Sequence, residues 1–393
     1  MNRLASITEL LPAKTFYFLY FAAGASLAPF LVLFYRQQGL DETQIGLLAG
    51  MQPLMTLAAA SLWGGLADAT RQHRFILRGA LVGAITFALL LATMRSFGGL
   101  AVVALAYAFF MAPIIPLVDN SVLELLGERS ERYGRIRLWG AVGWGLAGPV
   151  VGRLVDWGGL GYSFHIFALL QFGGLLLTFG MPVAQSGLGG NFWSGLRTLA
   201  ANRRWLIFLA VMFVGGMGSA TVHNFLFLYL EDLSASRLTM GLSLTVATLS
   251  EVVVFFFAEK MLARWGTVRV LALSLAVLAL RLLAYSFIHS AGWVLVVQLT
   301  HGLTFSALWV AGVAHAKKLA PPGMGATAQG LLTGVYFGVG GAAGAAIGGF
   351  LYQTAGPFAM YRWAAVWVVV GLGILGLSRL SPSLVRAGVK TKV

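Results

Sequence analysis

Long apolar runs, separated by short polar segments, recur along the whole chain. Each run holds about 20 or more mainly apolar residues, the length at which a helix crosses ~30 Å of hydrocarbon. The runs are continuous rather than alternating, which argues against the strands of a membrane barrel. They predict twelve transmembrane helices, over residues 15–36, 43–67, 75–95, 99–126, 133–155, 162–182, 204–230, 239–260, 267–287, 291–317, 323–353 and 359–379.

Composition supports the same class. Of the 393 residues, 59% are hydrophobic and 10% are charged, and the mean hydropathy is +0.83. These values describe an integral membrane protein and exclude a soluble monomer. The absence of cysteine excludes disulfides and thiolate metal sites. Residues 1–14 contain no small-residue cleavage site after a short apolar core, so we expect the first span to be retained.

The basic residues predict the orientation in the membrane. An even number of spans places both termini on one side. Twenty of the 27 Lys and Arg residues fall on that side and five on the other, while Arg137 and Arg281 lie within spans. Because basic residues concentrate on the cytoplasmic side, we expect a multi-pass protein of the bacterial inner (cytoplasmic) membrane with both termini cytoplasmic. The net charge of +14 therefore requires no nucleic-acid partner.

The chain also predicts an internal repeat. Asp68 ends the second predicted span and Glu259 ends the eighth, and basic residues follow each of them. Equivalent positions six spans apart are typical of a six-plus-six repeat. The longest polar, Gly-rich interruption covers residues 183–203. We therefore expect an N-terminal six-helix bundle over 1–182, a cytoplasmic linker over 183–203 and a C-terminal six-helix bundle over 204–393, with a substrate site between the bundles.

The loop after the second span carries a recognisable motif. Gly64, Leu66, Ala67, Asp68 and Arg74 fit the pattern G-x-L-A-D followed by basic residues, with Ala69 in place of one basic residue. This resembles the signature loop of the major facilitator superfamily. The resemblance implies an all-α membrane protein with twelve transmembrane helices in two bundles, which transports by alternating access. It also implies a conformational gate at Gly64, Asp68, Arg74 and Glu259. An ordinary positive-inside loop is the simpler alternative.

A first polar cluster falls on the fourth and fifth spans. Asp119 lies inside an apolar segment, where an unpaired carboxylate costs roughly 2.5–3.5 kcal/mol. Arg137, in the next and antiparallel span, is its expected partner, and Trp144 lies two helical turns further on. An aromatic ring beside hydrogen-bonding groups suits a sugar or a nucleoside. Alternatively, Asp119 and Arg137 form a structural pair, or an inner gate, since both lie nearer the cytoplasmic face than the midplane.

The order and spacing of Asp119, Arg137 and Trp144, with the run YGRIRLWG, resemble the lactose permease family. That resemblance implies that the three residues bind a sugar, although Asp119 is one methylene shorter than the family's glutamate. The same run, with PLVDN, also looks like the phenylpropionate permeases, whose ligands are aromatic acids. In that alternative Arg137 is the counter-ion of a carboxylate.

A second polar cluster falls on spans eight to ten, at Glu251, Arg281 and His301. Titratable groups at similar depth in neighbouring apolar helices need one another, and an arginine that moves could make a glutamate bind or release a proton. The cluster resembles those of the lactose and nucleoside permeases, which implies proton-coupled symport. Thr304 stands where the lactose permease has its proton-carrying glutamate, so Glu251 or Asp119 would carry the proton. A static Glu251–Arg281 ion pair is the alternative.

Two further polar residues within spans, His223 and Tyr336, are predicted to contribute to substrate binding. Metal, nucleotide and nucleophile motifs are missing from the sequence, so we expect no cofactor, no metal and no enzymatic activity. The expected partners are a small-molecule substrate, a proton and the lipid bilayer, and we expect a monomer.

Overall fold

The computed structural model describes residues 7–181, 199, 201–321 and 324–380, and these residues form helices joined by short turns. The helices are α1 (Ile7–Gln37), α2 (Glu42–Thr70), α3 (His73–Leu91), α4 (Phe97–Met111), α5 (Ile114–Leu126), η1 (Gly127–Arg132), α6 (Tyr133–Gly158), α7 (Gly161–Gly180), α9 (Arg203–Asp232), α10 (Arg237–Trp265), α11 (Thr267–Tyr285), α12 (Ala291–Gln298), α13 (His301–Thr304), α14 (Ser306–Leu319), α15 (Gly325–Thr333), η2 (Gly334–Gly340) and α16 (Gly341–Leu380).

The described helices account for the twelve predicted spans. Ten of them are long and apolar enough to cross a membrane, and the pair formed by α12 and residues 301–319, bent by 54°, gives an eleventh. The longest of the ten, Thr327–Leu377, turns at Gly356, whose φ of 81° is left-handed, so it supplies two spans. Glycine adopts this conformation without a steric penalty, and Pro357 begins the next helix. The twelve-helix prediction is thereby confirmed.

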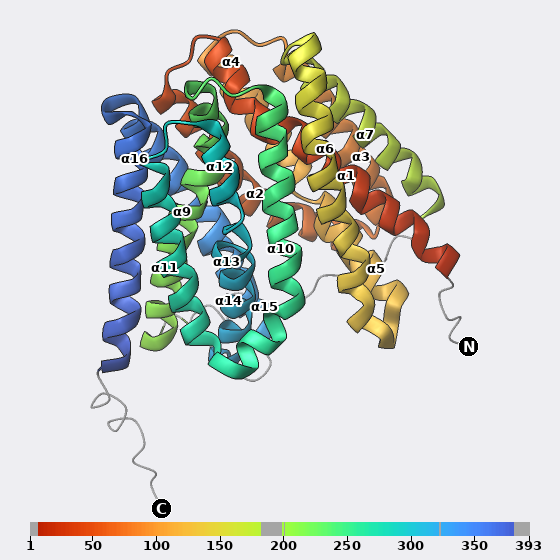
Figure 1. The fold of residues 1–393 in the computed structure, drawn as a ribbon. Helices are drawn as coiled ribbons and strands as arrows, with labels where there is room; N and C mark the ends of the chain where they lie inside the picture. Colours follow the sequence, from red (N-terminus) through yellow and green to blue (C-terminus); the bar gives the residue numbers. More distant parts are fainter. Residues whose placement is uncertain (1–6, 182–198, 200, 322–323, 381–393) are drawn as a thin grey trace, which may run out of the picture.

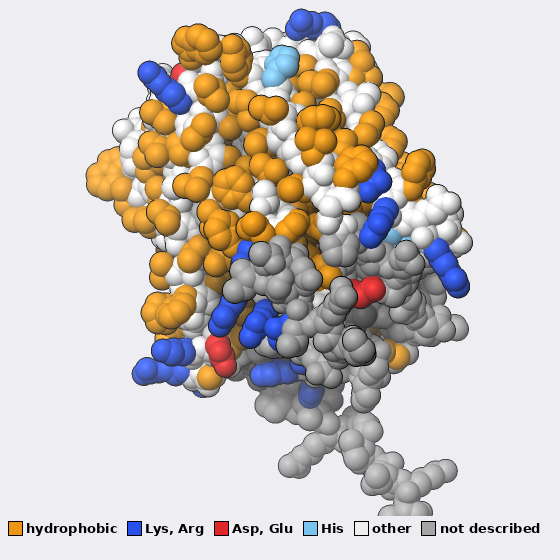
Figure 2. Space-filling view, turned by 90° about the vertical axis from the view of Figure 1, so that its right-hand side faces the viewer, with side chains coloured by type: hydrophobic (Ala, Val, Ile, Leu, Met, Phe, Trp, Pro, Cys, Tyr) orange, Lys and Arg blue, Asp and Glu red, His pale blue; other side chains and the backbone are white. Residues whose placement is uncertain are grey.

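The helices stand side by side, with the start of α1 and the end of α16 at the same end of the molecule (Figure 1). We call this the proximal end and the opposite one the distal end. Hydrophobic side chains cover much of the face drawn in Figure 2, as expected for a surface that meets lipid. Leu169, Phe172 and Phe179 of α7 are among the exposed hydrophobic residues of the molecule.

Packing divides the helices into two groups. In the first, α1 packs on α6 and α7, and α3 packs on α4 and α7; in the second, α16 packs on α9 and α11, and α11 packs on α14. The groups meet chiefly where α6 crosses α10 and where α2 crosses α16. The predicted linker, residues 183–203, lies mostly outside the described residues, so the domain bounds stay a prediction.

The two crossings between the groups depend on glycine. A Cβ at Gly241 of α10 would overlap the backbone of Gly148 on α6, and a Cβ at Gly46 of α2 would lie 2.9 Å from Cα of Gly349 on α16. All four glycines lie in the distal halves of their helices. Small residues at a helix crossing let the backbones approach closely. The distal halves of the two groups are therefore in tight contact.

Candidate functional site

The second predicted cluster forms one hydrogen-bonded chain. Oε1 of Glu251, on α10, lies 2.8 Å from Nε2 of His301, at the start of α13. On the other side of the ring, Nη1 of Arg281, on α11, lies 2.8 Å from Nδ1 of His301. Glu251 and Arg281 are thus joined through the imidazole rather than by the direct pair that was one of the alternatives.

Arg281 makes further hydrogen bonds within this chain. Its side chain is 4% exposed. The guanidinium donates to Thr304 Oγ1 at 2.8 Å, to Tyr285 Oη at 3.2 Å and to Gln298 Oε1. A planar guanidinium offers five donors in fixed directions, and this pocket of acceptors uses that geometry. Ser250, which precedes Glu251, accepts the backbone N–H of Gly302 at 2.9 Å and so fixes α10 against α13.

The first cluster contains a residue that the sequence did not single out as a ligand of the carboxylate. Tyr17, on α1, is fully buried and donates its hydroxyl to Oδ1 of Asp119 at 2.5 Å. The guanidinium of Arg137 lies over the rings of Phe21 and Tyr17, at 4.0 and 5.3 Å from their centroids. In the part of the chain that the structure describes, Asp119 and Arg137 are connected through Tyr17 instead of pairing directly.

Trp144 lies in the middle of α6 and reaches the second group of helices. Its ring faces His223 of α9, with the ring centroids 6.5 Å apart and the planes 24° from parallel. A Cβ at Gly24 of α1 would lie 3.1 Å from the indole, so this glycine makes room for the ring. His223 is exposed although it lies well inside a long apolar helix. The pair therefore presents two roughly parallel aromatic faces, one from each group.

The remaining predicted site residues are Tyr336 and the residues of the predicted gate. Tyr336, in η2, is 2% exposed, and its hydroxyl donates to Ser219 of α9 at 2.8 Å. Arg74 and Glu259 are exposed at the proximal end. Gly64 lies in the same region of α2, while the side chain of Asp68 lies outside what the structure describes. None of these placements tests a role in binding or gating.

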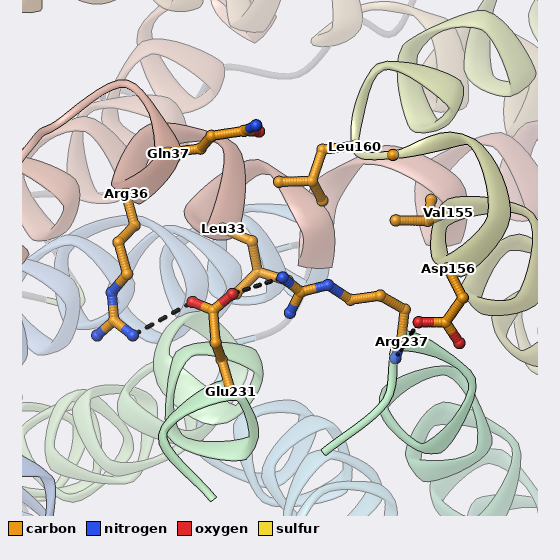
Figure 3. A pocket seen from close by; sticks show the side chains of 9 residues that line it. Leu33, Arg36, Gln37, Val155, Asp156, Leu160, Glu231 and Arg237 are labelled. Atoms are coloured by element: carbon orange, nitrogen blue, oxygen red, sulfur yellow. Dashed lines mark hydrogen bonds and ion pairs between the residues drawn. The ribbon is translucent and has the colours of Figure 1, made fainter. Parts of the chain in front are cut away.

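At the distal end a pocket of about 460 Å³ opens between the two groups of helices (Figure 3). Arg36 and Asp156, from α1 and α6, line one part of it, and Glu231 and Arg237, from α9 and α10, line another. Figure 3 shows Glu231 between the guanidiniums of Arg36 and Arg237. The backbone N–H of Arg237 donates to Asp156. Tyr352 of α16 joins the same group of charges by donating to Asp232 at 2.5 Å.

Comparison with known proteins identifies the family. The model of the MFS_1 like family matches residues 10–363, which is most of the chain. The chain belongs to the MFS_1 like family. It is therefore a transporter of the major facilitator superfamily and not an enzyme.

Individual relatives of this transporter differ in what their names say they carry. The chain is 29% identical to the maltose permease of Geobacillus stearothermophilus, over 92% of each protein. It is 24% identical to the probable 3-phenylpropionic acid transporter of Escherichia coli, over 76% of this chain and 80% of that one. Among solved structures, a variant of the nucleoside transporter NupG superposes with a TM-score of 0.85 at 17% identity, covering 94% of this chain and 99% of the other. The last comparison shows the fold alone.

Proposed function

We propose that this transporter couples the uptake of a small polar solute, a sugar or a nucleoside-like molecule, to the movement of a proton by alternating access. The maltose permease relative supports the sugar class. Asp119, Arg137, Trp144, His223 and Tyr336 are the proposed substrate residues, and Glu251, Arg281 and His301 handle the proton. Gly64, Asp68, Arg74 and Glu259 form the proposed inner gate.

The chain of contacts from Glu251 to Arg281 is the observation that carries the proposal. A guanidinium has only donors, so Nδ1 of His301 accepts from Arg281 and Nε2 holds the ring hydrogen. His301 is then neutral and donates to the carboxylate of Glu251. A proton taken up by Glu251 removes the negative charge that faces His301, while Arg281 stays charged. The change of charge alters contacts among α10, α11 and α13, and so couples protonation to helix movement.

The proposed solute position is at Trp144 and His223. Their ring centroids lie 6.5 Å apart, within the range of about 4.5–7 Å for a direct aromatic pair, so a solute ring would enter only when the two groups of helices separate there. The apolar face of a sugar or nucleoside ring would stack on Trp144, and His223 would contact the same ligand from the other group of helices. Such a ligand touches both groups at once, so its binding depends on how they are arranged. Arg137 lies seven residues, or about 10 Å of helix, from Trp144 toward the proximal end. One small monosaccharide would not fill both positions, whereas a disaccharide has the length to do so.

Uptake of radiolabelled maltose into proteoliposomes, driven by an imposed pH gradient, tests the proposal. We expect accumulation by the wild type. Glu251→Gln should equilibrate maltose across the membrane but not accumulate it, because an amide cannot carry the proton. Glu124→Gln, at an exposed carboxylate of α5 that the proposal gives no role, is the control and should accumulate maltose like the wild type. Full accumulation by Glu251→Gln would exclude this residue as the proton site.

An aromatic carboxylate is the second candidate substrate. The guanidinium of Arg137 lies over two aromatic rings, while Asp119 accepts a hydrogen bond from Tyr17. In this alternative the positive charge of Arg137 pairs with the carboxylate of the ligand. The phenylpropionic acid transporter among the relatives supports this class. A thermal-shift comparison decides between the two, since a ligand that binds only the folded protein stabilises it. Stabilisation by 3-phenylpropionate and not by maltose would favour the aromatic acid.

We further propose that the transporter is a monomer of the bacterial inner membrane with its proximal end in the cytoplasm. Exposed Arg71, Arg74, Lys260 and Arg264 at the proximal end support this orientation. Protease or antibody access to a tag on either terminus, in intact cells and in inverted vesicles, tests it. Access to the tag in intact cells would show that the orientation is the opposite of the proposed one.

A further inference from the structure

Charged side chains from both groups of helices form a connected network at the distal end. Arg36, at the end of α1, lies 3.0 Å from Glu42 of α2, 3.3 Å from Glu231 and 2.7 Å from Asp232, both of α9. Glu231 in turn lies 2.5 Å from the guanidinium of Arg237, which starts α10. A single arginine thus bridges α1, α2 and α9.

The network continues to α6 through a helix cap supplied from another helix group. Asp156, near the end of α6, accepts the backbone N–H of Arg237 at 2.8 Å and that of Leu238 at 3.0 Å. First-turn amides of a helix have no partner within the helix, and a negative charge is favoured there. Ser236 caps the same turn locally by accepting from Thr239. Asp156 therefore satisfies two amides of α10 only while α6 and α10 stay together.

Three of these connections cross from one group of helices to the other. They are Asp156 with the start of α10, Arg36 with Glu231, and Arg36 with Asp232. Opening of the distal end would separate the partners and break all three. We propose that Arg36, Asp156, Glu231, Asp232 and Arg237 form a distal latch that holds this end closed and sets how often it opens. The inference rests on the alternating access of the proposed function.

The latch should respond to salt. Arg36, Glu231 and Arg237 are 22–29% exposed, so their attraction is partly screened. The pocket beside them gives dissolved ions access to the charges. The screening length falls from ~10 Å at 0.1 M to ~3 Å at 1 M. Salt on the distal side should therefore favour opening, while salt on the proximal side should not.

A single introduced cysteine can report the opening, because the chain has none of its own. Phe30 of α1 is fully buried, and its ring meets Phe227 of α9 at 5.1 Å across the two groups, inward of the latch. In a Phe30→Cys background, we would measure the labelling rate by a membrane-impermeant maleimide. Right-side-out and inverted vesicles expose the two ends in turn, so the orientation is determined in the same experiment.

Asp156→Ala and Arg36→Gln should each increase the rate of labelling from the distal side by about tenfold, the effect of losing about one helix cap or a comparable charge contact. Asp156→Asn, which keeps an acceptor oxygen, should fall between Asp156→Ala and the latch-intact protein. Arg153→Ala, at an exposed charge one turn earlier on α6, is the matched control and should not change the rate. Raising the distal salt should accelerate labelling of the latch-intact protein and have little effect in Arg36→Gln, which lacks the ion pairs between the two groups.

The proposed latch would be wrong if Asp156→Ala and Arg36→Gln left the rate of labelling from the distal side unchanged. It would also be wrong if Arg153→Ala increased that rate as much as they do. If Asp156→Ala fails to fold, Asp156→Asn and the salt dependence of the latch-intact protein decide by the same criteria. The readout requires neither a solute nor a proton gradient. A wrong substrate or a wrong proton site in the proposed function would therefore leave this result intact.

Discussion

Tyr17 shows how a buried carboxylate is stabilised inside the first group of helices. Asp119 was expected to pair with Arg137, since arginine is the usual partner of a carboxylate in a membrane. The structure instead gives Asp119 a short hydrogen bond from a fully buried tyrosine. The sequence does contain a signal, a tyrosine inside the first span, but it carries no information on the distance to a residue 102 positions away.

Removal of the Tyr17 hydroxyl tests the importance of that bond. Tyr17→Phe removes one of the two tyrosine hydroxyls that hydrogen-bond to the carboxylate, the other being that of Tyr133. We therefore expect the free energy of unfolding to fall by up to about 1.5–3 kcal/mol, the range for hydrogen bonds to charged groups. The midpoint of thermal unfolding in detergent measures the change. Tyr20→Phe is the matched control on the same helix: its ring stacks on Phe16, and the phenylalanine ring can keep that contact. Equal effects of the two substitutions would contradict a specific role of the Tyr17 hydroxyl.

The Glu251, Arg281 and His301 cluster was predicted more completely than the first. The spacing and depth of the three residues placed them together, and the structure joins them in one chain. The further ligands of Arg281, which are Thr304, Tyr285 and Gln298, were not predicted as such. Single polar residues in apolar helices are ambiguous in sequence, because each can bond to its own backbone or face any neighbour.

At the scale of helices, the apolar runs predict the number of membrane-spanning helices better than they predict where a helix is broken. Twelve spans were predicted, and the described helices account for twelve. The breaks are local events within them, at Pro113 between α4 and α5 and between Gln298 and His301. Proline explains the first, because it interrupts the helical hydrogen bonds. The bend before His301 contains no proline, and hydropathy cannot reveal it.

A glycine in the second group of helices lets α9 and η2 approach closely, and a substitution there tests how much this contact contributes to stability. A Cβ at Gly216 of α9 would overlap the carbonyl oxygen of Tyr336 in η2. Gly216→Ala should therefore lower the free energy of unfolding by about 1–3 kcal/mol, the usual effect of overpacking. Thermal unfolding measures it.

Gly79→Ala is the control for this substitution. Gly79 lies in helix α3, and a Cβ there meets nothing within 4 Å. Because alanine is the better helix former by about 1 kcal/mol, this variant should be unchanged or slightly more stable. A loss of stability in Gly79→Ala as large as in Gly216→Ala would show that the effect is not one of helix approach.

At the scale of the whole molecule, contacts between the two groups of helices were beyond sequence-based reasoning. Arg36, the last residue of the first predicted span, and Arg237 were counted only among the five basic residues on the side opposite the termini. Their partners are set by how the groups dock, and the bond from Arg36 to Asp232 joins residues 196 positions apart. Each residue alone is typical of a polar loop at a membrane surface. The network exists only when both groups have folded and met.

A cross-link at the distal end tests whether opening there is a required step of transport. Asp156 accepts the backbone N–H of Leu238 at 3.0 Å, so cysteines at these two positions lie within reach of a short thiol cross-linker when the end is closed. Asp156→Cys with Leu238→Cys should transport maltose before treatment and stop after it, because the distal end can no longer open. Each single-cysteine variant, treated in the same way, should continue to transport. Solute binding from the proximal side should survive the cross-link, since the bond closes only the distal end. Wild-type uptake by fully cross-linked protein would mean that the solute crosses without separating α6 from α10, and alternating access at this crossing would then be wrong.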